Sequence, residues 1–536
     1  EGGSAFAQLP DDRNLAVAIC FLHSYANPEH ERTAKALVSR LKPEAYVCAS
    51  SEVLPQFREY ERFNTTALNA YIGPLMRRYL TGLSASLAKR GFAQDLYIMT
   101  SNGGVSTAER AAQLPVTTVL SGPAGGVAAA VHLGRLLDIP NLITCDMGGT
   151  STDVCLIENL RIPLANEQKI SGYANRTPQI EINAVGAGGG SIGWIDAGDI
   201  LAVGPQSAAA SPGPACYGRG GTQPTVTDAN LLLNRLAAES PLAGGRIRLD
   251  PALSRAALQP LAARLGIDEI RLADGIVRIA IARMVSAIKQ ISISNGFDPR
   301  DFALLPYGGA GPMHAVAIAE ELEIPRVLIP LGPGNFAAFG SLISDIRRDY
   351  VRTRTLNVND AALASIETAF AEIEAQAAAD LRAEGVPQDR IRLHRSAGMR
   401  FLGQSWELNI ELQGAGQSAK SMIDAFLDVH ERRFGHRKGD TVEIVNFRIT
   451  AIGLVDRPSL QALSPGQTQG QAAQGERQVY FDGAFLATPV FRRDKLVLGE
   501  TIPGPAVIEE SGSTTVMPPD WKATVIGHGE LMLERI

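Results

Sequence analysis

Four glycine-rich loops, each directly after a run of apolar residues, constrain the fold of this chain more than any other feature. The loops are SGPAGG at 121–126, DMGGTSTD at 146–153, VGAGGGSIG at 185–193 and YGGAGPMHA at 307–315. Glycine has no Cβ atom, so the backbone at such points can approach a ligand closely. Strands that end in glycine-rich loops are a common place for ligand binding in α/β proteins.

Alternating strand and helix patterns fill the first hundred residues and predict an α/β layer structure. The run LAVAICFLHSY and the segment AYVCASSEVL are expected to be strands, with a helix over residues 28–41 between them. A helix over residues 276–291 carries a stripe of apolar side chains typical of core packing. The chain has 536 residues, beyond the size of one core, so several domains are expected.

Composition excludes several classes of protein. The formal net charge of −6 offers no electrostatic footprint for nucleic acid. No apolar run approaches the ~20 residues of a membrane span, and the first 30 residues lack a signal-type core, so a cytoplasmic protein is expected. The five cysteines are an odd number with no CxxC pair, which favours free thiols.

The segment NLITCDMGGTSTDVCLIEN predicts a β-hairpin, because two apolar strands flank a glycine turn. The turn's amides can converge on a phosphate, and Thr150, Ser151 and Thr152 add hydroxyl donors. Asp146 stands at the mouth of the turn, where a carboxylate can hold Mg²⁺. A purely structural hairpin with a capping aspartate is the alternative. With the turn centred near Thr150, Cys145 and Cys155 are expected to lie across from each other, reduced.

The segment DFALLPYGGAGPMHA predicts a strand from Phe302 to Tyr307 and a helix beginning near Pro312. The glycines between them suit the sugar or base of a nucleotide, although GGxG is also a common tight turn. His314, just inside the helix, is expected to be a packing residue.

Other candidates have weaker support. A metal site at His23, His30 and Glu31 is less expected than ordinary strand-end and helix-face roles. Cys216 is interpreted as an inert thiol, because no histidine lies near it in the sequence. For Asp228, orientation of substrate and capping of the following helix have equal weight.

Together the two principal loops resemble the actin, Hsp70 and sugar-kinase ATPase fold. The series SNGGV, VLSGPAGGV, DMGGTSTDV, EINAVGAGGGSIGWID, SPGPACYGRGGTQPTVTDANLLLNRL and YGGAGPMHA is similar, almost motif for motif, to the hydantoinase A/5-oxoprolinase family. The resemblance extends from FLHSYANPEHE to GPAVIEESGSTTV.

The resemblance implies a site for ATP and Mg²⁺, with Asp146 and Asp153 as catalytic residues and Asp146 as the metal ligand. The nucleotide-binding residues implied in this way are Gly148, Gly149, Thr150, Ser151 and Thr152 in the hairpin, Gly186, Gly188, Gly189, Gly190 and Ser191 beside it, and Gly308, Gly309, Ala310 and Gly311 in the adenosine loop.

The implied activity is ATP-dependent hydrolysis of a cyclic amide such as 5-oxoproline or a hydantoin, by phosphorylation of the carbonyl oxygen. A hydantoinase B-like partner and an oligomer are expected. An ATP-dependent ketone carboxylase subunit and a non-catalytic assembly subunit are alternatives. Family members open with a second hairpin of the pattern DxGGTxTD, which this sequence lacks. The chain alone is therefore expected to bind ATP weakly and to be inactive.

Five consecutive segments are predicted from these patterns. They are the remainder of a first ATPase lobe at 1–115, a core with both nucleotide loops at 116–350, an α+β domain at 351–457, a linker at 458–477 and a small β module at 478–536. Within the α+β domain, MRFLGQSWELNIEL is expected to be one strand.

Overall fold

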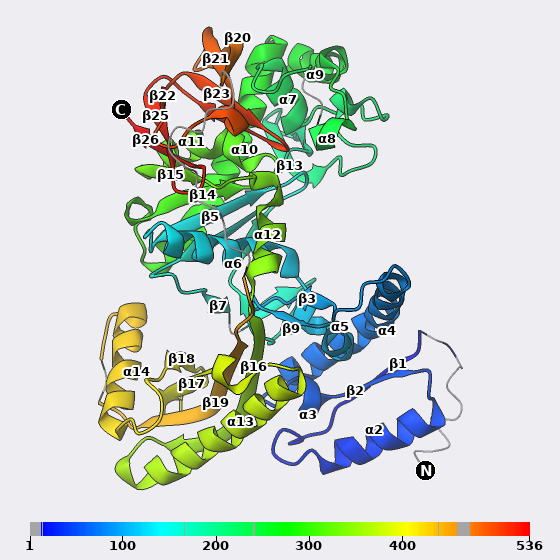
Figure 1. Ribbon diagram of the computed structural model, residues 1–536, viewed down its shortest axis with the longest axis vertical. Coiled ribbons are helices and arrows are strands. Elements are labelled where there is room, and N and C mark those ends of the chain that lie inside the picture. The colour runs from blue at the N-terminus through cyan, green and yellow to red at the C-terminus, as the bar shows by residue number, and fades with distance from the viewer. Residues whose placement is uncertain (1–11, 13, 166, 240–241, 438, 458–471) are drawn as a thin grey trace. The chain divides into compact units, whose positions relative to one another are not determined.

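The computed structural model describes residues 12, 14–165, 167–239, 242–437, 439–457 and 472–536 (Figure 1). The chain divides into two compact units, each assembled from stretches that are separated in sequence. Unit 1 takes the described residues of 1–124, 164–180 and 343–457, and unit 2 takes those of 125–163, 181–342 and 458–536. The consecutive segments predicted from the sequence are therefore distributed over two interleaved units.

Unit 2 is built on an eight-stranded sheet with the order β11-β6-β5-β14-β15-β26-β25-β22. Its strands are β5 (Leu142–Met147), β6 (Thr152–Ile157), β11 (Asn183–Val185), β14 (Ala303–Tyr307), β15 (Arg326–Ile329), β22 (Thr501–Pro503), β25 (Trp521–Ile526) and β26 (Glu530–Arg535). The strands β5, β14 and β15 are parallel, so their carboxyl ends share one edge of the sheet. That edge is where open α/β sheets bind ligands.

Two of the helices of unit 2 pack directly on this sheet. The helices of the unit are α7 (Val226–Leu232), α8 (Leu242–Gly245), α9 (Pro251–Leu265), α10 (Glu269–Ile291) and α11 (Gly311–Glu321), with α6 (Ser121–Leu136) and α12 (Phe336–Ile343) at the boundaries between the units. The helix α10 packs on β6 and β11, and α11 packs on β14 and β15. The predicted core stripe of α10 is confirmed, because Ile276, Met284 and Ile288 are fully buried.

The C-terminal strands share the core of unit 2. A four-stranded sheet contains β20 (Ala473–Phe481), β21 (Ala484–Arg492), β23 (Ala506–Glu510) and β24 (Ser513–Met517), while β22, β25 and β26 extend the main sheet. Trp521 is buried and donates its indole N–H to Glu320 of α11 at 2.9 Å. Most of the predicted linker, residues 458–471, lies outside the described residues, and its last part belongs to β20.

A second hairpin of unit 2 joins β12 (Ser191–Ile195) to β13 (Leu201–Ser207). It follows the glycine-rich segment at 186–190, and α10 contacts β13. The glycine-rich segment is thus connected through β12 and β13 to α10, which packs on the main sheet.

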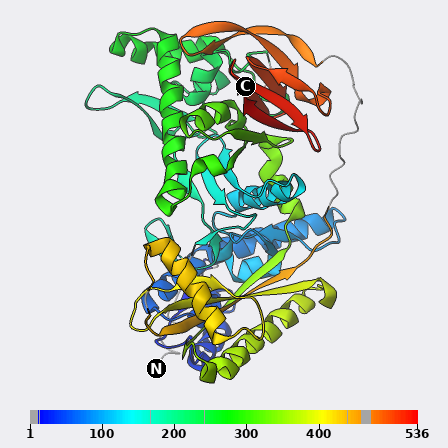
Figure 2. The ribbon, with the colours of Figure 1, turned by 90° about the vertical axis from the view of Figure 1, so that its left-hand side faces the viewer.

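Unit 1 contains a six-stranded sheet with the order β18-β17-β19-β16-β4-β3. The strands are β3 (Tyr97–Met99), β4 (Val105–Thr107), β16 (Ile346–Asn357), β17 (Ile391–Phe401), β18 (Leu408–Glu411) and β19 (Val442–Gly453). The helix α13 (Leu363–Ala383) packs on β19, and α14 (Ala419–Phe434) packs on β18 (Figure 2). The predicted single strand MRFLGQSWELNIEL is thus wrong, because a turn through Gly403, at φ +85°, separates β17 from β18.

The remainder of unit 1 begins with the parallel pair β1 (Ala16–Ile19) and β2 (Tyr46–Ala49). Its other elements are α2 (Glu29–Leu41), α3 (Ser50–Val53), α4 (Glu59–Lys89), α5 (Ala108–Gln113), β7 (Leu164–Ala165), β8 (Gln168–Ile170), β9 (Tyr173–Asn175) and β10 (Gln179–Ile180). The segment AYVCASSEVL was predicted to be one strand, but it turns into α3 after Ala49. At this point the Glu31 carboxylate accepts bonds from Ser50 Oγ and Ser51 N and holds the start of α3.

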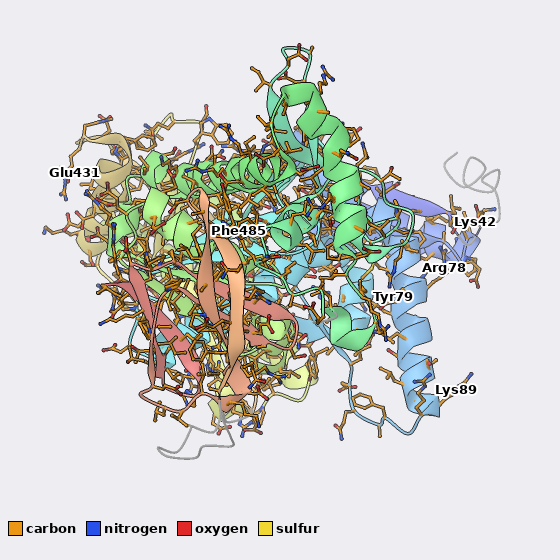
Figure 3. All side chains as sticks on the ribbon, turned by 90° about the horizontal axis from the view of Figure 1, so that it is seen from above. Lys42, Arg78, Tyr79, Lys89, Glu431 and Phe485 are labelled. Atoms are coloured by element: carbon orange, nitrogen blue, oxygen red, sulfur yellow. The ribbon has the colours of Figure 1, made fainter. Side chains whose placement is uncertain are left out.

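The long helix α4 leaves an apolar stripe outside the core of unit 1. Tyr71, Leu75 and Tyr79 are 86%, 62% and 60% exposed at helical spacing. Tyr79 and Lys89 both project from this helix in Figure 3. None of the helices in the described part of the chain is long and apolar enough to cross a membrane.

Candidate nucleotide site

The predicted hairpin is confirmed. The strands β5 and β6 are antiparallel, and Met147 pairs with Thr152 as the last residues before a four-residue turn. Within the turn, Gly148 donates its N–H to the carbonyl of Ser151 at 3.2 Å. Gly149 and Thr150 are exposed at the tip, where their backbone can meet a ligand.

The expected placement of Cys145 and Cys155 is wrong in register. Cys145 pairs with Val154 and Cys155 pairs with Thr144, so the two thiols are offset by one residue. Because successive residues of a strand point to opposite faces, the thiols lie on opposite faces of the sheet. Both are free, as expected, and burial raises the pKa of the Cys145 thiol to about 12.

The same register places two carboxylates together. Asp146 pairs directly with Asp153, so both side chains project from one face of the hairpin. Burial and, to a smaller extent, the neighbouring charge of Asp153 together raise the pKa of Asp146 to about 7. Burial alone raises the pKa of Asp153 to about 6. Two adjoining, partly buried carboxylates favour a bound proton or a hard cation, so this oxygen donor pair fits Mg²⁺.

The glycine-rich segment 186–191 braces the hairpin turn. Gly189 and Gly190 donate their N–H groups to the carbonyls of Gly148 and Gly149 at 3.0 and 2.6 Å. A Cβ atom on Gly188 would lie 2.7 Å from backbone atoms of Thr150, so only glycine permits this approach. Ser191 accepts a bond from Gly188 N at 2.8 Å through its hydroxyl. These groups are engaged within the protein and hold the turn's shape.

Thr152 has a similar structural role. Its side chain is fully buried, and its hydroxyl donates to the carbonyl of Ala187. Of the three predicted hydroxyl donors, Thr150 and Ser151 are the ones with accessible surface.

The predicted adenosine loop lies against the carboxylate pair. The strand β14 is parallel to β5, and Tyr307 pairs with Asp146. Gly308 has φ +77°, and a Cβ atom there would lie 2.6 Å from Asp146 Oδ1. Ala310 donates its N–H to the carbonyl of Met147 at 3.1 Å. The loop Gly308–Gly311 and the hairpin therefore form one continuous backbone surface at the carboxyl edge of the sheet.

His314 is a packing residue. It is 1% exposed, and Asn230 Nδ2 lies 3.3 Å from its Nε2. Burial lowers the pKa of His314 to about 3, and the nearby charge of Arg235 acts in the same direction, so the imidazole is neutral.

A third loop at this edge was missed by sequence reasoning. The segment LGPGN at 331–335 follows β15, as the other two loops follow β5 and β14. Pro333 accepts the N–H of Gly308 at 2.9 Å, which joins this loop to the adenosine loop. The repeated pattern of an apolar strand followed by glycines was the signal that would have found it.

The remaining candidates are structural in this fold. The Asp228 carboxylate accepts bonds from Thr225 N at 3.0 Å, Cys216 N at 2.8 Å and Ser254 Oγ at 2.8 Å, so it caps α7 and fixes the Cys216 loop. Burial raises the pKa of the Cys216 thiol. Among the described residues no group of three His, Cys, Asp or Glu side chains is placed to hold a metal, and Glu31 is engaged by its hydrogen bonds to the chain around β2.

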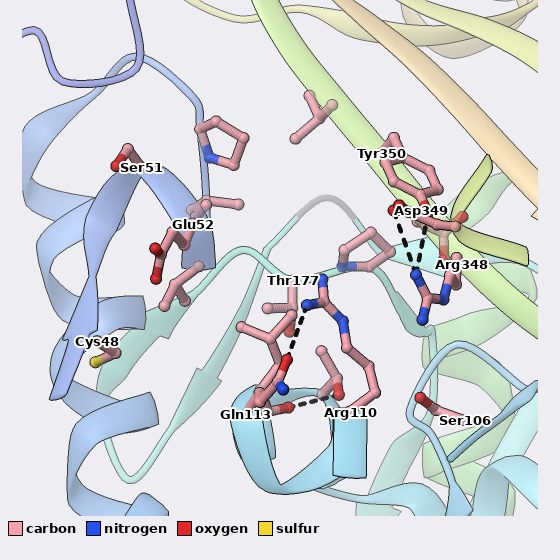
Figure 4. A pocket seen from close by; sticks show the side chains of 18 of the residues that line it. Cys48, Ser51, Glu52, Ser106, Arg110, Gln113, Thr177, Arg348, Asp349 and Tyr350 are labelled. Carbon is pink, nitrogen blue, oxygen red and sulfur yellow. Dashed lines mark hydrogen bonds and ion pairs between the residues drawn. The ribbon is translucent and has the colours of Figure 1, made fainter. Parts of the chain in front are cut away.

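Unit 1 contains a large cavity of about 1620 Å³ that none of the predicted site residues lines (Figure 4). Arg110 and Arg348 both face it. Burial lowers the pKa of Arg110, and the charge of Arg348 lowers it further. The volume exceeds the ~300–1,000 Å³ of ordinary ligand pockets. The candidate site is assigned to the hairpin of unit 2 because the carboxylate pair and the exposed glycines Gly149 and Gly309 are there.

Two family descriptions match this sequence. Hydantoinase/oxoprolinase matches residues 62–350, and Hydantoinase/oxoprolinase C-terminal domain matches residues 355–535. The chain belongs to the hydantoinase/oxoprolinase family.

Relatives of this hydantoinase/oxoprolinase chain carry several activities in their names. Caprolactamase subunit alpha of Pseudomonas jessenii is 37% identical, over 95% of this chain and 75% of the relative. 5-oxoprolinase of Saccharomyces cerevisiae is 30% identical, over 95% of this chain and 41% of the relative. Acetone carboxylase beta subunit of Xanthobacter autotrophicus is 27% identical, over 96% of this chain and 74% of the relative. The crystal structure of ATP-dependent caprolactamase from Pseudomonas jessenii matches with a TM-score of 0.85 at 36% identity, covering 97% of this chain and 77% of that one.

Proposed function

We propose that this protein is the nucleotide-handling subunit of an ATP-dependent amidohydrolase that opens a cyclic amide. The observation that carries the proposal is the Asp146–Asp153 carboxylate pair in a glycine-tipped hairpin, directly beside the loop Gly308–Gly311. The similarity to ATP-dependent caprolactamase and 5-oxoprolinase supports a lactam as the substrate. The actin-like ATPase architecture belongs to the same proposal, supported by the parallel strands that carry these loops.

The phosphates of ATP are proposed to lie at the hairpin tip. Exposed backbone at Gly149 and Thr150 and the hydroxyl of Ser151 can supply donors there. Asp146, with Asp153, would hold Mg²⁺, and when bound the ion neutralises charge on the phosphates. Gly189 and Gly190 hold the turn through their hydrogen bonds to Gly148 and Gly149, and Thr152 bonds the hairpin to Ala187 of the same glycine-rich segment.

The reaction couples a difficult hydrolysis to phosphoryl transfer. The lactam carbonyl oxygen attacks the γ-phosphorus of ATP, an O–P bond forms, and ADP leaves. A first water molecule adds to the activated carbon and the C–N bond breaks with a proton passing to nitrogen, which leaves an acyl phosphate. A second water molecule adds to the acyl carbon, and the C–O bond to phosphate breaks. The products are an open-chain amino acid, ADP and inorganic phosphate. Phosphorylation is required because an amide oxygen is otherwise a poor leaving group, and the enzyme contributes mainly position and charge.

A ketone carboxylase subunit is the second candidate, favoured by the similarity to acetone carboxylase beta subunit. The carboxylate hairpin would serve both reactions, since each begins with phosphorylation of a carbonyl oxygen. Relatives that are named as subunits support a hydantoinase B-like partner for this chain, in which the second half of the reaction takes place.

The test is ATP hydrolysis by the full-length protein with its partner, measured with a panel of lactams and, separately, with ketones plus bicarbonate. Lactam-dependent ADP release together with the amino acid product is the expected result. If ADP release instead required a ketone and bicarbonate, the protein would be a carboxylase subunit rather than an amidohydrolase subunit. ATP hydrolysis that responds to neither class would contradict both.

A further inference from the structure

The large cavity of unit 1 has more cationic than anionic side chains on its wall. Ten arginine or lysine residues and four aspartate or glutamate residues line it, among the residues that the structure describes. They come from several elements of unit 1, which include α2, α4, α5, β16 and β19. A concave wall with an excess of one charge concentrates solutes of the opposite charge. The cavity is therefore expected to attract anions.

Some of these cations are already balanced by carboxylates of the protein. Arg347 pairs with Asp349 at 3.5 Å. Arg348 pairs with Asp380 at 3.3 Å and also with Glu384. Since a guanidinium that is held by a carboxylate has few donors left, these pairs support the wall and are not expected to hold a ligand.

Arg110 and Arg448 differ from these residues, because neither forms an ion pair with a carboxylate in the described part of the chain. Arg110 extends from α5 into the cavity (Figure 4), and its guanidinium donates to the side-chain oxygen of Gln113 over a long 3.4 Å. The Nε atom of Arg448, on β19, is buried and has no hydrogen-bond partner among the described residues. The protein thus leaves the charge of both guanidinium groups without a directly bonded counter-charge.

The pKa values of the two groups reflect this imbalance. Burial lowers the pKa of Arg110, and the positive charge of Arg348 also lowers it. Burial is the main cause that lowers the pKa of Arg448 to about 10, although the charge of Glu407 acts in the opposite direction. An anion bound beside either group would offset these effects, because an opposite charge favours the ionised form.

A buried hydroxyl without a partner lies on the same wall. Ser106 of β4 is 5% exposed and lines the cavity (Figure 4), and its Oγ has no hydrogen-bond partner among the described residues. Leaving such a group unpaired costs free energy, which an oxyanion accepting its proton would recover. Leu54, Leu80 and Ile373 add apolar surface to the wall. Charged donors, a hydroxyl and apolar surface together suit an organic anion.

We propose that the cavity of unit 1 binds a small organic anion, whose carboxylate or phosphate groups pair with Arg110 and Arg448. A planar guanidinium can donate two parallel N–H bonds to either kind of group, so both chemistries fit. The proposal goes beyond the proposed function and stands on different residues, because the described wall of the cavity includes neither the hairpin nor the loop Gly308–Gly311.

The test titrates three probes into the full-length protein without nucleotide. The probes are glutarate, its neutral analogue glutaramide, and inorganic phosphate. Binding is measured calorimetrically for wild type, Arg110→Gln, Arg110→Lys and Arg448→Gln. Arg432→Gln, at an exposed position of α14 that does not line the cavity, is the matched control for loss of a positive charge. Thermal melting of each variant checks the fold.

The wild type should bind glutarate or phosphate and should not bind glutaramide. Arg110→Gln and Arg448→Gln should each weaken the Kd of the anion by at least ~10-fold, because charge-assisted hydrogen bonds are lost. Arg110→Lys should weaken it less, since lysine keeps the charge but not the planar fork. Arg432→Gln should stay within ~2-fold of wild type. Tighter binding of glutarate would identify a carboxylate ligand, and tighter binding of phosphate a phosphate ligand.

Three results would overturn the proposal. They are no binding of either anion by the wild type, equal binding of glutaramide, and anion affinity that is unchanged in both glutamine variants. Arg110→Gln alone decides the last point if Arg448→Gln does not fold. None of these results concerns ATP, so the proposed function would stand or fall separately.

Discussion

Replacing Asp146 by asparagine should stabilise the nucleotide-free protein at neutral and alkaline pH while abolishing its ATP-dependent activity. The carboxylate is placed where burial and the charge of Asp153 both oppose its ionisation. Two carboxylates close together with no cation between them repel each other, and burial adds to the cost of their ionisation. The asparagine side chain removes the charge and keeps nearly the same volume.

The sign and size of the expected change in stability follow from the pKa of Asp146. Burial and the charge of Asp153 raise this pKa from 3.8 to about 7. In the unfolded chain the group ionises near pH 4, whereas the folded protein keeps the proton until about pH 7. Stability therefore falls as pH rises between these values, and the penalty is complete above about pH 7. The difference between the two pKa values corresponds to a loss of at most roughly 4 kcal/mol in the free energy of unfolding. We expect Asp146→Asn to recover about 2 kcal/mol of it, because asparagine still buries a polar amide.

The measurement is unfolding of wild type and Asp146→Asn without divalent cations at about pH 4 and about pH 8. The variant should be more stable by about 2 kcal/mol at the higher pH and equal within ~0.5 kcal/mol at the lower. Mg²⁺ should stabilise the wild type only, because it binds the folded site. The exposed Asp520→Asn substitution is the control and should have no effect. A variant that is less stable than wild type at both pH values would refute the reasoning.

Three further outcomes follow from the hairpin and its supports. Gly188→Ala should lower the free energy of unfolding by ~1–3 kcal/mol, because its Cβ atom would meet Thr150, whereas Gly148→Ala, with open space around it, should cost under ~1 kcal/mol in the same melting assay. Thr152→Val should destabilise by ~1–3 kcal/mol in chemical denaturation, since the carbonyl of Ala187 loses its buried donor; a neutral effect would mean that the bond is dispensable. Cys145, with its pKa raised to about 12 by burial, should react with thiol reagents only on unfolding, and fast labelling of the native protein would contradict the burial.

The parts of the site that were predicted correctly are local in sequence. The hairpin around Gly148 and Gly149 follows from two apolar runs on either side of a glycine turn, and the strand, loop and helix around Gly308 follow in the same way. Their mutual contact depends on the parallel pairing of β14 with β5, which no local pattern in the sequence reveals.

The predicted register of the hairpin is wrong, because the register depends on the length of the turn. A turn centred on Thr150 would pair the two cysteines, but the observed four-residue turn pairs Asp146 with Asp153. A shift of one residue moves every side chain to the other face. The observed register therefore brings Asp146 and Asp153 together as a pair, whereas the sequence analysis treats them as two separate aspartates.

Contacts between distant segments lay beyond sequence reasoning. Backbone N–H groups of Gly189 and Gly190 bond to the carbonyls of Gly148 and Gly149. Bonds between backbone groups cannot be predicted from residue types, because every residue carries the same groups. The approach of Gly512 to Gly309 joins positions that are two hundred residues apart and depends on the C-terminal strands entering the sheet of unit 2. The C-terminal segment read in isolation had therefore been predicted as a separate β module.

The most direct test of the account follows the lactam carbonyl oxygen. The full-length protein with its partner is given ATP and a lactam labelled with oxygen-18 at the carbonyl, and the released phosphate is examined by mass spectrometry. Phosphorylation of that oxygen predicts one labelled oxygen in the phosphate for each ring opened, and no labelled phosphate from Asp146→Asn. If all of the label remained in the carboxylate product while ATP was consumed, the proposed sequence of phosphorylation at the carbonyl oxygen and C–O cleavage would be contradicted.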